Sequence, residues 1–234
     1  MTRSVLVTGG SRGIGLAVAQ SFAAQGDRVA VTYRSSGTPE GFFGVRCDVT
    51  KADEVNAAFE AVEAENGPVE VLVSNAGITR DTLLLRMTDD EWGAVIDTNL
   101  TGAYRVARRA ARGMLRSHSG RMIFVSSVVG LSGSAGQSNY AATKAGLVGF
   151  ARSIAREFGS RGITANVVAP GFVDTELTAV LSDDRRAELL EQIPLKRYAS
   201  PKEIAGVVRF LASDEAAYIT GAVIPVDGGL GMGH

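Results

Sequence analysis

The sequence predicts an α/β protein built on one doubly wound parallel sheet of about seven strands, with helices on both faces. Three observations predict it. Short, Val-rich runs alternate with longer helical patterns along the whole chain, without a linker, repeat or low-complexity segment. The length of 234 residues fits one domain with a sizeable core, so residues 1–234 are expected to form a single domain. Hydrophobic residues at 45% and charged residues at 21% are ordinary for a globular protein.

The predicted strands are short and apolar, as expected for strands that are covered on both faces. The first leads straight into a glycine-rich turn, and the fifth is an apolar run that ends in two serines. The full set is Ser4–Thr8, Arg28–Tyr33, Gly44–Cys47, Val69–Ser74, Arg121–Ser127, Ile163–Ala169 and Ala222–Val226.

Helical patterns fill the gaps between these strands. The first is followed by Gly26, a residue type that commonly ends a helix. The second carries apolar residues on one face and acids on the other, which is typical of an amphipathic helix. The predicted helices are Gly13–Gln25, Lys51–Asn66, Glu91–Arg116, Asn139–Phe158 and Glu203–Ser213.

One polar stretch, Asp174–Lys196, breaks the alternation after the sixth strand. It carries short helical patterns around Leu177–Leu181 and Arg185–Gln192. Such an insertion is typical of a lid over a substrate, and equally of an ordinary surface excursion.

Several function classes are excluded by what the sequence lacks. No apolar run approaches a membrane span, and no secretion signal precedes the first strand, so a cytoplasmic protein without a membrane partner is expected. The single cysteine, Cys47, excludes an internal disulfide and is predicted to be a small buried hydrophobe. With only His118 and His234, no metal site or Ser/His/Asp arrangement is expected, and no phosphate loop occurs.

Charge is distributed unevenly along the chain, although the net charge is only -1. Between Thr98 and Arg156 there is no Asp or Glu. Such a stretch could steer an acidic partner or a phosphate-bearing substrate, or it could be a solvated helix face whose partners come from elsewhere. Nucleic acid is not an expected partner. The basic residues are Arg105, Arg108, Arg109, Arg112, Arg116, Arg121, Lys144, Arg152 and Arg156.

The first glycine-rich turn indicates a Rossmann-type dinucleotide site. Gly9, Gly13 and Gly15 let the backbone turn tightly and approach a pyrophosphate at a helix N-terminus. An acid that would hold a ribose 2′-hydroxyl is absent after the second strand. Arg12 and Arg34 could instead clamp a 2′-phosphate, so NADPH/NADP is the predicted cofactor.

The third strand is followed by Asp48 and Val49, which are placed to meet the adenine ring. The local alternative is that Asp48 or Thr50 caps the following helix.

A second pattern, Tyr140-Ala-Ala-Thr-Lys144, indicates proton transfer. The i, i+4 spacing puts both side chains on one helix face. A lysine ammonium beside a phenol favours the phenolate and lowers the tyrosine pKa, which makes proton exchange near neutral pH feasible. With Ser127 at the end of the fifth strand and a dinucleotide site in the same domain, the sequence suggests hydride transfer.

Six motifs occur in a fixed order: Thr8-Gly9-x-x-x-Gly13-x-Gly15, Asn75-Ala76-Gly77, Asn99, Ser127, Tyr140-x-x-x-Lys144 and Pro170-Gly171. Their order and spacing resemble the short-chain dehydrogenase/reductase family along essentially the whole chain. Gln137-Ser-Asn-Tyr-Ala-Ala-Thr-Lys, Asn166-Val-Val-Ala-Pro-Gly-Phe and Val226-Asp-Gly-Gly resemble the β-ketoacyl-[acyl-carrier-protein] reductases, the FabG type. The loop after Tyr33 and the glycine-rich tail are most similar to the ketoacyl reductases of mycolic-acid elongation. Ser132 stands where those carry a tryptophan near the substrate.

The resemblance implies NADPH-dependent reduction of a 3-oxoacyl group on acyl carrier protein. Tyr140 is then the proton donor to the ketone, Lys144 assists it and binds the nicotinamide ribose, and Ser127 binds the substrate carbonyl. Asn99 holds a water that links Lys144 to solvent, although its residue chemistry alone favours a local turn or a helix bend. The residues that it implies for the cofactor are Gly9, Ser11, Arg12, Gly13, Ile14, Gly15, Arg34, Asp48, Val49, Asn75, Ala76, Gly77, Tyr140, Lys144, Pro170, Gly171, Val173 and Thr175.

The resemblance also implies a homotetramer, with dimer contacts through Thr101–Arg116 and Asn139–Phe158. Arg116 and Arg161 are expected near the rim of the active site, as contacts for an acidic carrier. Two other functions stay open: reduction of another ketone such as acetoacetyl-CoA, and a non-catalytic dinucleotide-binding regulator. The complete Asn99/Ser127/Tyr140/Lys144 set disfavours the regulator.

Overall fold

The computed structural model describes residues 2–175 and 183–232. A seven-stranded sheet of strand order β3-β2-β1-β4-β5-β6-β7 forms the centre, and every neighbouring pair is parallel. The strands are β1 Ser4–Val7, β2 Arg28–Tyr33, β3 Phe43–Arg46, β4 Val71–Ser74, β5 Gly120–Val125, β6 Ile163–Pro170 and β7 Val223–Val226. The predicted fold class is confirmed, and strand boundaries differ from the sequence-based ranges by one or two residues.

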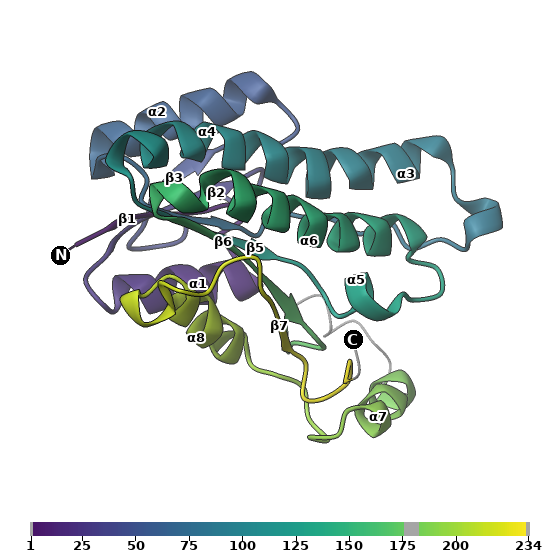
Figure 1. Cartoon of the computed structure of the whole chain (residues 1–234). Coiled ribbons are helices and arrows are strands. Elements are labelled where there is room, and N and C mark those ends of the chain that lie inside the picture. The colour runs from purple at the N-terminus through teal and green to yellow at the C-terminus, as the bar shows by residue number, and fades with distance from the viewer. Residues whose placement is uncertain (1, 176–182, 233–234) are drawn as a thin grey trace.

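Helices cover both faces of the sheet, as Figure 1 shows. The α-helices are α1 Gly13–Ala23, α2 Ala52–Asn66, α3 Asp89–Ile96, α4 Gly102–Ser117, α5 Val129–Ser132, α6 Ser138–Phe158, α7 Asp183–Gln192 and α8 Pro201–Leu211. The buried side of α2, α4 and α6 joins one core cluster, whereas α1 and α8 join a second cluster on the opposite face. Two cores on two faces explain why the strands are apolar on both sides.

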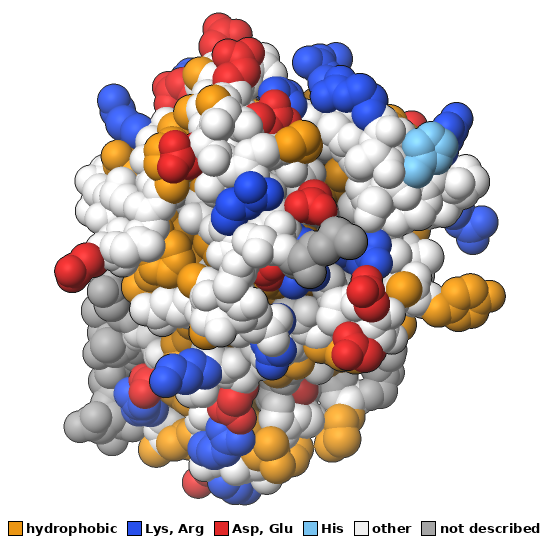
Figure 2. Space-filling view, turned by 90° about the vertical axis from the view of Figure 1, so that its left-hand side faces the viewer, with side chains coloured by type: hydrophobic (Ala, Val, Ile, Leu, Met, Phe, Trp, Pro, Cys, Tyr) orange, Lys and Arg blue, Asp and Glu red, His pale blue; other side chains and the backbone are white. Residues whose placement is uncertain are grey.

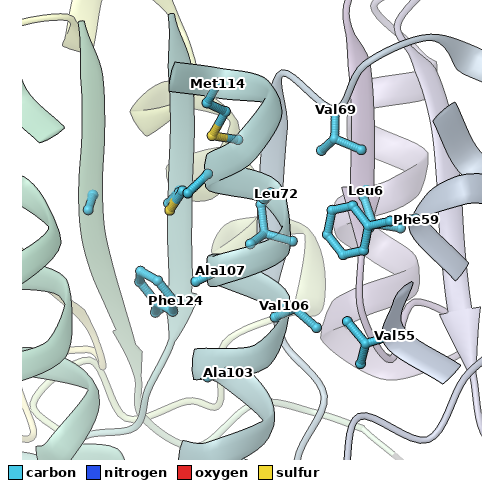
Figure 3. Close-up of a cluster of buried hydrophobic side chains, with 14 of the residues drawn as sticks. Leu6, Val55, Phe59, Val69, Leu72, Ala103, Val106, Ala107, Met114 and Phe124 are labelled. Carbon is cyan, nitrogen blue, oxygen red and sulfur yellow. The ribbon is translucent and has the colours of Figure 1, made fainter. Parts of the chain in front are cut away.

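The first core is an interdigitated apolar layer between the sheet and α2 and α4 (Figure 3). Phe59 and Phe124 are its large side chains, and each is at most 1% exposed. Alanines on α4, such as Ala103 and Ala107, let that helix lie close to the strands. Burial of this face, rather than intrinsic propensity, accounts for most of the stability of α4.

The predicted helix Glu91–Arg116 is interrupted. Asp97–Thr101 forms a π turn between α3 and α4, and the Gly102 N–H donates to the Asp97 carbonyl five residues back. The α3 helix begins with a capping box in which Thr88 and Glu91 satisfy one another's backbone N–H groups. The interruption therefore lies inside a well-started helical segment, where the sequence predicted continuity.

The insertion after β6 is partly helical. The pattern around Arg185–Gln192 is confirmed by α7, whereas the pattern around Leu177–Leu181 lies outside the described residues. Leu189 of α7 and the next residue after the helix, Ile193, pack against Tyr198 and Phe172, so α7 is attached to the segment that directly follows β6. The short helix α5 was not predicted.

The basic stretch is partly neutralised within the fold. Arg105 pairs with Asp97 at 2.7 Å and Arg109 with Glu63 at 2.6 Å. On the side of the molecule where the N-terminus lies, Figure 2 shows positive and negative side chains intermingled. For Arg105 and Arg109, the prediction that ion-pair partners come from elsewhere in the fold is therefore confirmed.

Two features are absent from residues 2–175 and 183–232. No helix there has both the length and the hydropathy to cross a bilayer. No group of three or more His, Cys, Asp and Glu side chains there is arranged to hold a metal ion.

Candidate active site

Four neighbouring strands end at the same edge of the sheet, and the loops that follow them carry the predicted site residues. The order β1-β4-β5-β6 places Gly9, Asn75, Ser127 and Gly171 side by side at the carboxyl edge. Ligands of open parallel sheets bind at this edge. Residues that are far apart in the sequence are thus brought together by the strand order.

The glycine turn after β1 is shaped by the absence of side chains. Gly9 and Gly13 have φ of +62° and +54°, in the left-handed region that favours glycine. At Gly15 a Cβ atom would overlap the Gly9 carbonyl oxygen, so the turn closes only around a glycine.

Residues directly after β4 hold the glycine turn through hydrogen bonds. The Asn75 side-chain amide donates to the carbonyl oxygens of Thr8 and Gly9 at 3.1 and 3.0 Å. The Thr8 hydroxyl accepts from the backbone N–H groups of Asn75 and Ala76 at 3.0 and 3.2 Å. Asn75 and Ala76 therefore hold the shape of the glycine turn.

These features fit a dinucleotide pyrophosphate. The α1 helix, of 11 residues, begins at Gly13, and the side chain of its N-cap residue Arg12 makes no capping hydrogen bond. Glycines that leave the backbone uncovered at a helix N-terminus are the arrangement that receives phosphate groups. Ser11 and Ile14 belong to the same turn.

The loop after β2 lies against this turn. The hydroxyl oxygens of Ser11 and Ser36 are 2.7 Å apart, so the exposed side chains of Arg12 and Arg34 come from adjoining loops. The two arginines of the predicted clamp thus lie on neighbouring loops.

Asp48 is held in a local turn and caps no helix. Its carboxylate accepts from the Thr50 N–H at 2.9 Å and the Thr50 hydroxyl at 2.8 Å, whereas α2 begins after Lys51. Burial opposes ionisation, but the two Thr50 hydrogen bonds and the positive charges of Arg34 and Lys51 outweigh it and lower the Asp48 pKa. The capping alternative for Asp48 and Thr50 is wrong. Val49 is buried beside them.

The β5 end and the first turns of α6 carry the proton-transfer groups. Tyr140 and Lys144 lie one helical turn apart on α6, and the Lys144 Nζ atom is 5.4 Å from the centre of the Tyr140 ring. The Ser127 side chain lies close enough to the Tyr140 phenol to lower its pKa. The Lys144 ammonium donates to the Val125 carbonyl at 2.7 Å, which ties α6 to the last residue of β5.

The pKa values of this pair differ from the sequence expectation. Desolvation of Tyr140 raises its pKa, whereas the neighbouring Ser127 side chain lowers it, so the expected net depression of the Tyr140 pKa is wrong because burial outweighs the attraction of the Lys144 ammonium. Burial lowers the pKa of Lys144 to about 8. The cause is that the ammonium, directed at the Val125 carbonyl, is itself largely removed from water. Tyr140 consequently keeps its proton at neutral pH, which suits a proton donor.

Asn99 sits in the middle of the π turn and is 2% exposed. Its side-chain oxygen accepts from the Ile78 N–H at 2.8 Å, and its amide donates to the Ile78 carbonyl at 2.9 Å and to the Thr143 hydroxyl at 3.3 Å. Gly77 lies in the same corner, since a Cβ there would be 3.2 Å from the Asn99 oxygen and 3.7 Å from the Lys144 Nζ. The helix bend that the residue chemistry of Asn99 favoured is present, and Asn99 lies near Lys144; the water that links Lys144 to solvent stays a prediction.

The residues after β6 lie beside the loops of Ser127 and of the glycine turn. The Pro170 carbonyl accepts from the Val128 N–H at 2.8 Å, so the loop after β6 is fixed beside the loop of Ser127. Gly171 packs against Asp227, because a Cβ there would lie 2.8 Å from the Asp227 Cα. Val173 is buried, and Thr175 lies next to Gly13, with its methyl carbon 3.7 Å from where a Cβ would stand.

Two polar residues that the sequence analysis did not single out position this site. Ser126 donates to the Lys144 backbone carbonyl at 2.8 Å. Asn139 accepts from the Tyr140 N–H at 2.7 Å and donates to the Arg80 carbonyl at 3.0 Å. Their only sequence signal was their place next to Ser127 and Tyr140, which did not distinguish them from other polar neighbours.

Comparison with known proteins identifies the family. Residues 9–231 match a family model described as "Enoyl-(Acyl carrier protein) reductase", which belongs to the short-chain dehydrogenase/reductases. The chain belongs to the short-chain dehydrogenase/reductase family. This is a family of dinucleotide-dependent reductases, in agreement with the glycine turn.

Within this family, the chain is similar to proteins named 3-oxoacyl-[acyl-carrier-protein] reductase. It is 60% identical to the MabA protein of Mycobacterium tuberculosis (strain ATCC 25618 / H37Rv), over all of this chain and 95% of that protein. The MabA protein of Mycobacterium avium is 59% identical over 100% of this chain and 92% of its own length. The FabG protein of Escherichia coli (strain K12) is 49% identical over 97% of this chain and 96% of that protein.

The prediction that Arg116 and Arg161 lie at the rim of the site, which was made from the basic charges of the sequence, is wrong within a single chain. Arg116 lies in the last turn of α4, and Arg161 lies just before β6, beside His118, at 3.2 Å between side-chain nitrogens. Both precede strands and therefore lie at the amino edge of the sheet, whereas the short-chain reductase site lies at the carboxyl edge. They cannot form the rim of their own chain's active site.

Proposed function

We propose that this protein reduces a 3-oxoacyl group carried on acyl carrier protein to the 3-hydroxyacyl group, using NADPH. The observation that carries the proposal is the convergence of Ser127, Tyr140, Lys144 and Asn99 beside the glycine turn. The names of the MabA and FabG relatives support this substrate, and fatty-acid elongation, including that of mycolic acids, is the setting that we propose.

The mechanism assigns one task to each side chain. A bound NADPH supplies the hydride that reduces the ketone carbon. Tyr140 donates its proton to the ketone oxygen, and the Ser127 hydroxyl donates a hydrogen bond to the same oxygen as negative charge develops there. The Lys144 ammonium stabilises the phenolate left on Tyr140. Asn99 holds the backbone at Ile78, which directly follows Gly77 in the corner near Lys144.

NADPH, rather than NADH, is supported by Arg12 and Arg34. A guanidinium pairs with a phosphate through charge-assisted hydrogen bonds, each worth about 1.5–3 kcal/mol, so the loss of one lowers affinity by roughly one to two decades. Fluorescence titration tests this choice: Arg34→Ala should weaken NADPH binding and leave NADH binding nearly unchanged. Equal affinities of the wild type for both cofactors would contradict the proposal.

The substrate is tested by steady-state NADPH oxidation. Ketoacyl thioesters of several chain lengths are compared on carrier protein and on coenzyme A, and we expect the carrier-bound forms to be preferred. Preference for acetoacetyl-CoA would favour the alternative of a different short-chain ketone reductase. Tight NADPH binding without turnover of any thioester would favour a dinucleotide-binding regulator.

The assembly that we propose is a homotetramer. Small residues such as Ala142, Ala145 and Gly149 form an exposed stripe on α6, which suits close packing of a second copy. The α6 helix spans about 30 Å at 1.5 Å per residue. A two-fold axis across its middle would bring Arg161 of one copy to the catalytic edge of the other. A monomeric mass by light scattering at micromolar concentration would reject the tetramer.

The compartment that we propose is the cytoplasm. Cys47 is a free, buried thiol, and burial raises its pKa to about 12, so it stays in its unreactive thiol form. An inert free thiol fits a reducing compartment, where structural disulfides are rare. Fractionation of cells that produce the protein tests this placement.

A further inference from the structure

Arg105 connects two parts of the molecule that carry different functions. Its Nη1 atom is 2.7 Å from the Asp97 carboxylate and 3.5 Å from the Val49 carbonyl oxygen. Asp97 is the first residue of the π turn that carries Asn99, and Val49 lies in the loop expected to meet the adenine. One side chain thus contacts both the catalytic and the adenosine side of the site.

The ion pair brackets the π turn. Asp97 precedes Asn99, whereas Arg105 follows it in the first turns of α4. The backbone of the bracketed residues departs from the α-helical pattern, since the Gly102 N–H bonds to the Asp97 carbonyl. A π turn inside a helix is uncommon and tends to occur at functional sites. A clamp across it opposes relaxation to a regular helix, which would rotate Asn99 away from Ile78.

Packing reinforces this connection. Val49 is buried, and its side chain lies so close to Gly102 that a Cβ there would be 2.7 Å from a Val49 methyl carbon. The start of α4 therefore presses directly on the loop of Asp48 and Val49. On its other side Arg105 shares a hollow between α2 and α4 with Arg108, Arg109 and Arg112. Like charges on that side favour the orientation of Arg105 toward Asp97.

We propose that Arg105 is a positioning residue for the reaction: its pair with Asp97 holds the π turn in the shape that places Asn99 next to Ile78 and Lys144. A test of Arg105 by enzyme activity rests on the proposed reductase function, whereas a test by hydrogen exchange does not. Arg105 touches neither of the reacting groups, and it acts through Asp97 and Asn99.

The chain offers a matched control. Arg109 lies one turn further along α4, pairs with Glu63 at 2.6 Å and lines the same hollow, but it has no contact with the π turn. Arg105→Met and Arg109→Met each remove one guanidinium and one ion pair while keeping an apolar stem. A purely structural contribution of these arginines predicts similar effects for both variants.

Two readouts separate positioning from stability. Arg105→Met should lower kcat by about tenfold, because small displacements of groups that act in catalysis cost one to two decades in rate, and Arg109→Met should leave kcat unchanged. Amide hydrogen exchange at Ile78, whose N–H bonds to Asn99, should accelerate in Arg105→Met and not in Arg109→Met. Arg105→Lys, which keeps a charge near Asp97, should recover most of kcat.

Equal losses of kcat in the two Met variants, or unchanged exchange at Ile78 in Arg105→Met, would overturn the proposal. If the wild-type protein itself reduces no 3-oxoacyl thioester, the proposed function fails instead. The exchange comparison then still decides the role of Arg105, because it needs no substrate.

Discussion

Helices α4 and α6 cover the same face of the sheet, and both bring polar groups to the catalytic edge, but they do so differently. The α6 helix runs unbroken for 21 residues and presents Tyr140 and Lys144 by its regular spacing. The α4 helix begins only after a π turn, and Asn99 reaches the site from the irregular part. The two helices also differ in their attachments. The Lys144 side chain and backbone on α6 bond to β5 and the loop after it, whereas Asn99 bonds to the segment after β4.

The difference shows two ways of placing a side chain. Regular helix geometry fixes the relative position of Tyr140 and Lys144 within one element, so their spacing follows from the sequence. Asn99 needs a break in its helix and three hydrogen bonds to other elements to reach its position. We therefore expect changes on α6 to act on the chemistry itself, and changes at the π turn to act on both chemistry and stability.

The largest expected effect is at Tyr140. Tyr140→Phe removes only the hydroxyl group, so the fold and NADPH binding should persist. General acid catalysis contributes about 10²–10⁴-fold, and kcat should fall by at least that range. Single-turnover NADPH oxidation, with a binding titration on the same sample, measures it. Turnover within a few-fold of wild type, with normal binding, would show that Tyr140 is not the proton donor.

Asn99→Ala should lower both activity and stability, in contrast to Tyr140→Phe. The partly buried N–H and carbonyl of Ile78 lose their side-chain partner, which costs about 1–3 kcal/mol in the free energy of unfolding. The kcat value should fall by about tenfold or more. Urea unfolding and steady-state kinetics check the two effects, and Thr143→Val, which removes only one of the three contacts, serves as the milder comparison.

The pH dependence of kcat sharpens the role of Lys144. Burial lowers its pKa from 10.5 to about 8, so the ammonium is charged below that pH and neutral above it. Because the charged form stabilises the tyrosinate, kcat for ketone reduction should be level near pH 7 and fall above about pH 8. Steady-state kcat values measured between pH 6.5 and 9.5 test for this decline. A level profile over that range would mean that the Lys144 charge is not needed.

The smallest expected effects lie at the far ends of the two helices. If two copies pack antiparallel along α6, Arg161→Glu should weaken reduction of a carrier-bound substrate a few-fold and spare a small free thioester, because rim charges act mainly on association. Arg116→Glu, at the end of α4, is the matched comparison. Parallel losses on both substrates would indicate damage to folding or catalysis.

Part of the site was predictable from local patterns. The strand-turn-helix order and the positions of Gly9, Gly13 and Gly15 predict the turn after β1, because only glycine takes its left-handed φ values or allows its close contacts. The i, i+4 spacing of Tyr140 and Lys144 predicts their common face. Alternation of strands and helices predicts the parallel sheet, and with it the edge at which the loops gather.

Other features were decided by contacts between distant elements. The π turn at Asn99 forms because its side chain bonds Ile78 and Thr143, and no periodicity in Glu91–Arg116 reports such a break. The raised pKa of Tyr140 and the lowered pKa of Lys144 follow from burial between β5 and α6, which outweighs the pairwise attraction that the spacing suggested. The predicted placement of Arg116 and Arg161 at the rim of the site was wrong because the presence of basic residues in a sequence gives no information about which sheet edge a residue reaches. The sequence by itself therefore determined the parallel α/β fold, the glycine turn and the helix that carries Tyr140 and Lys144, since these depend on spacing along the chain. Only the tertiary structure decided the local electrostatics and the shape of the π turn, since these depend on burial and on partners far away in sequence.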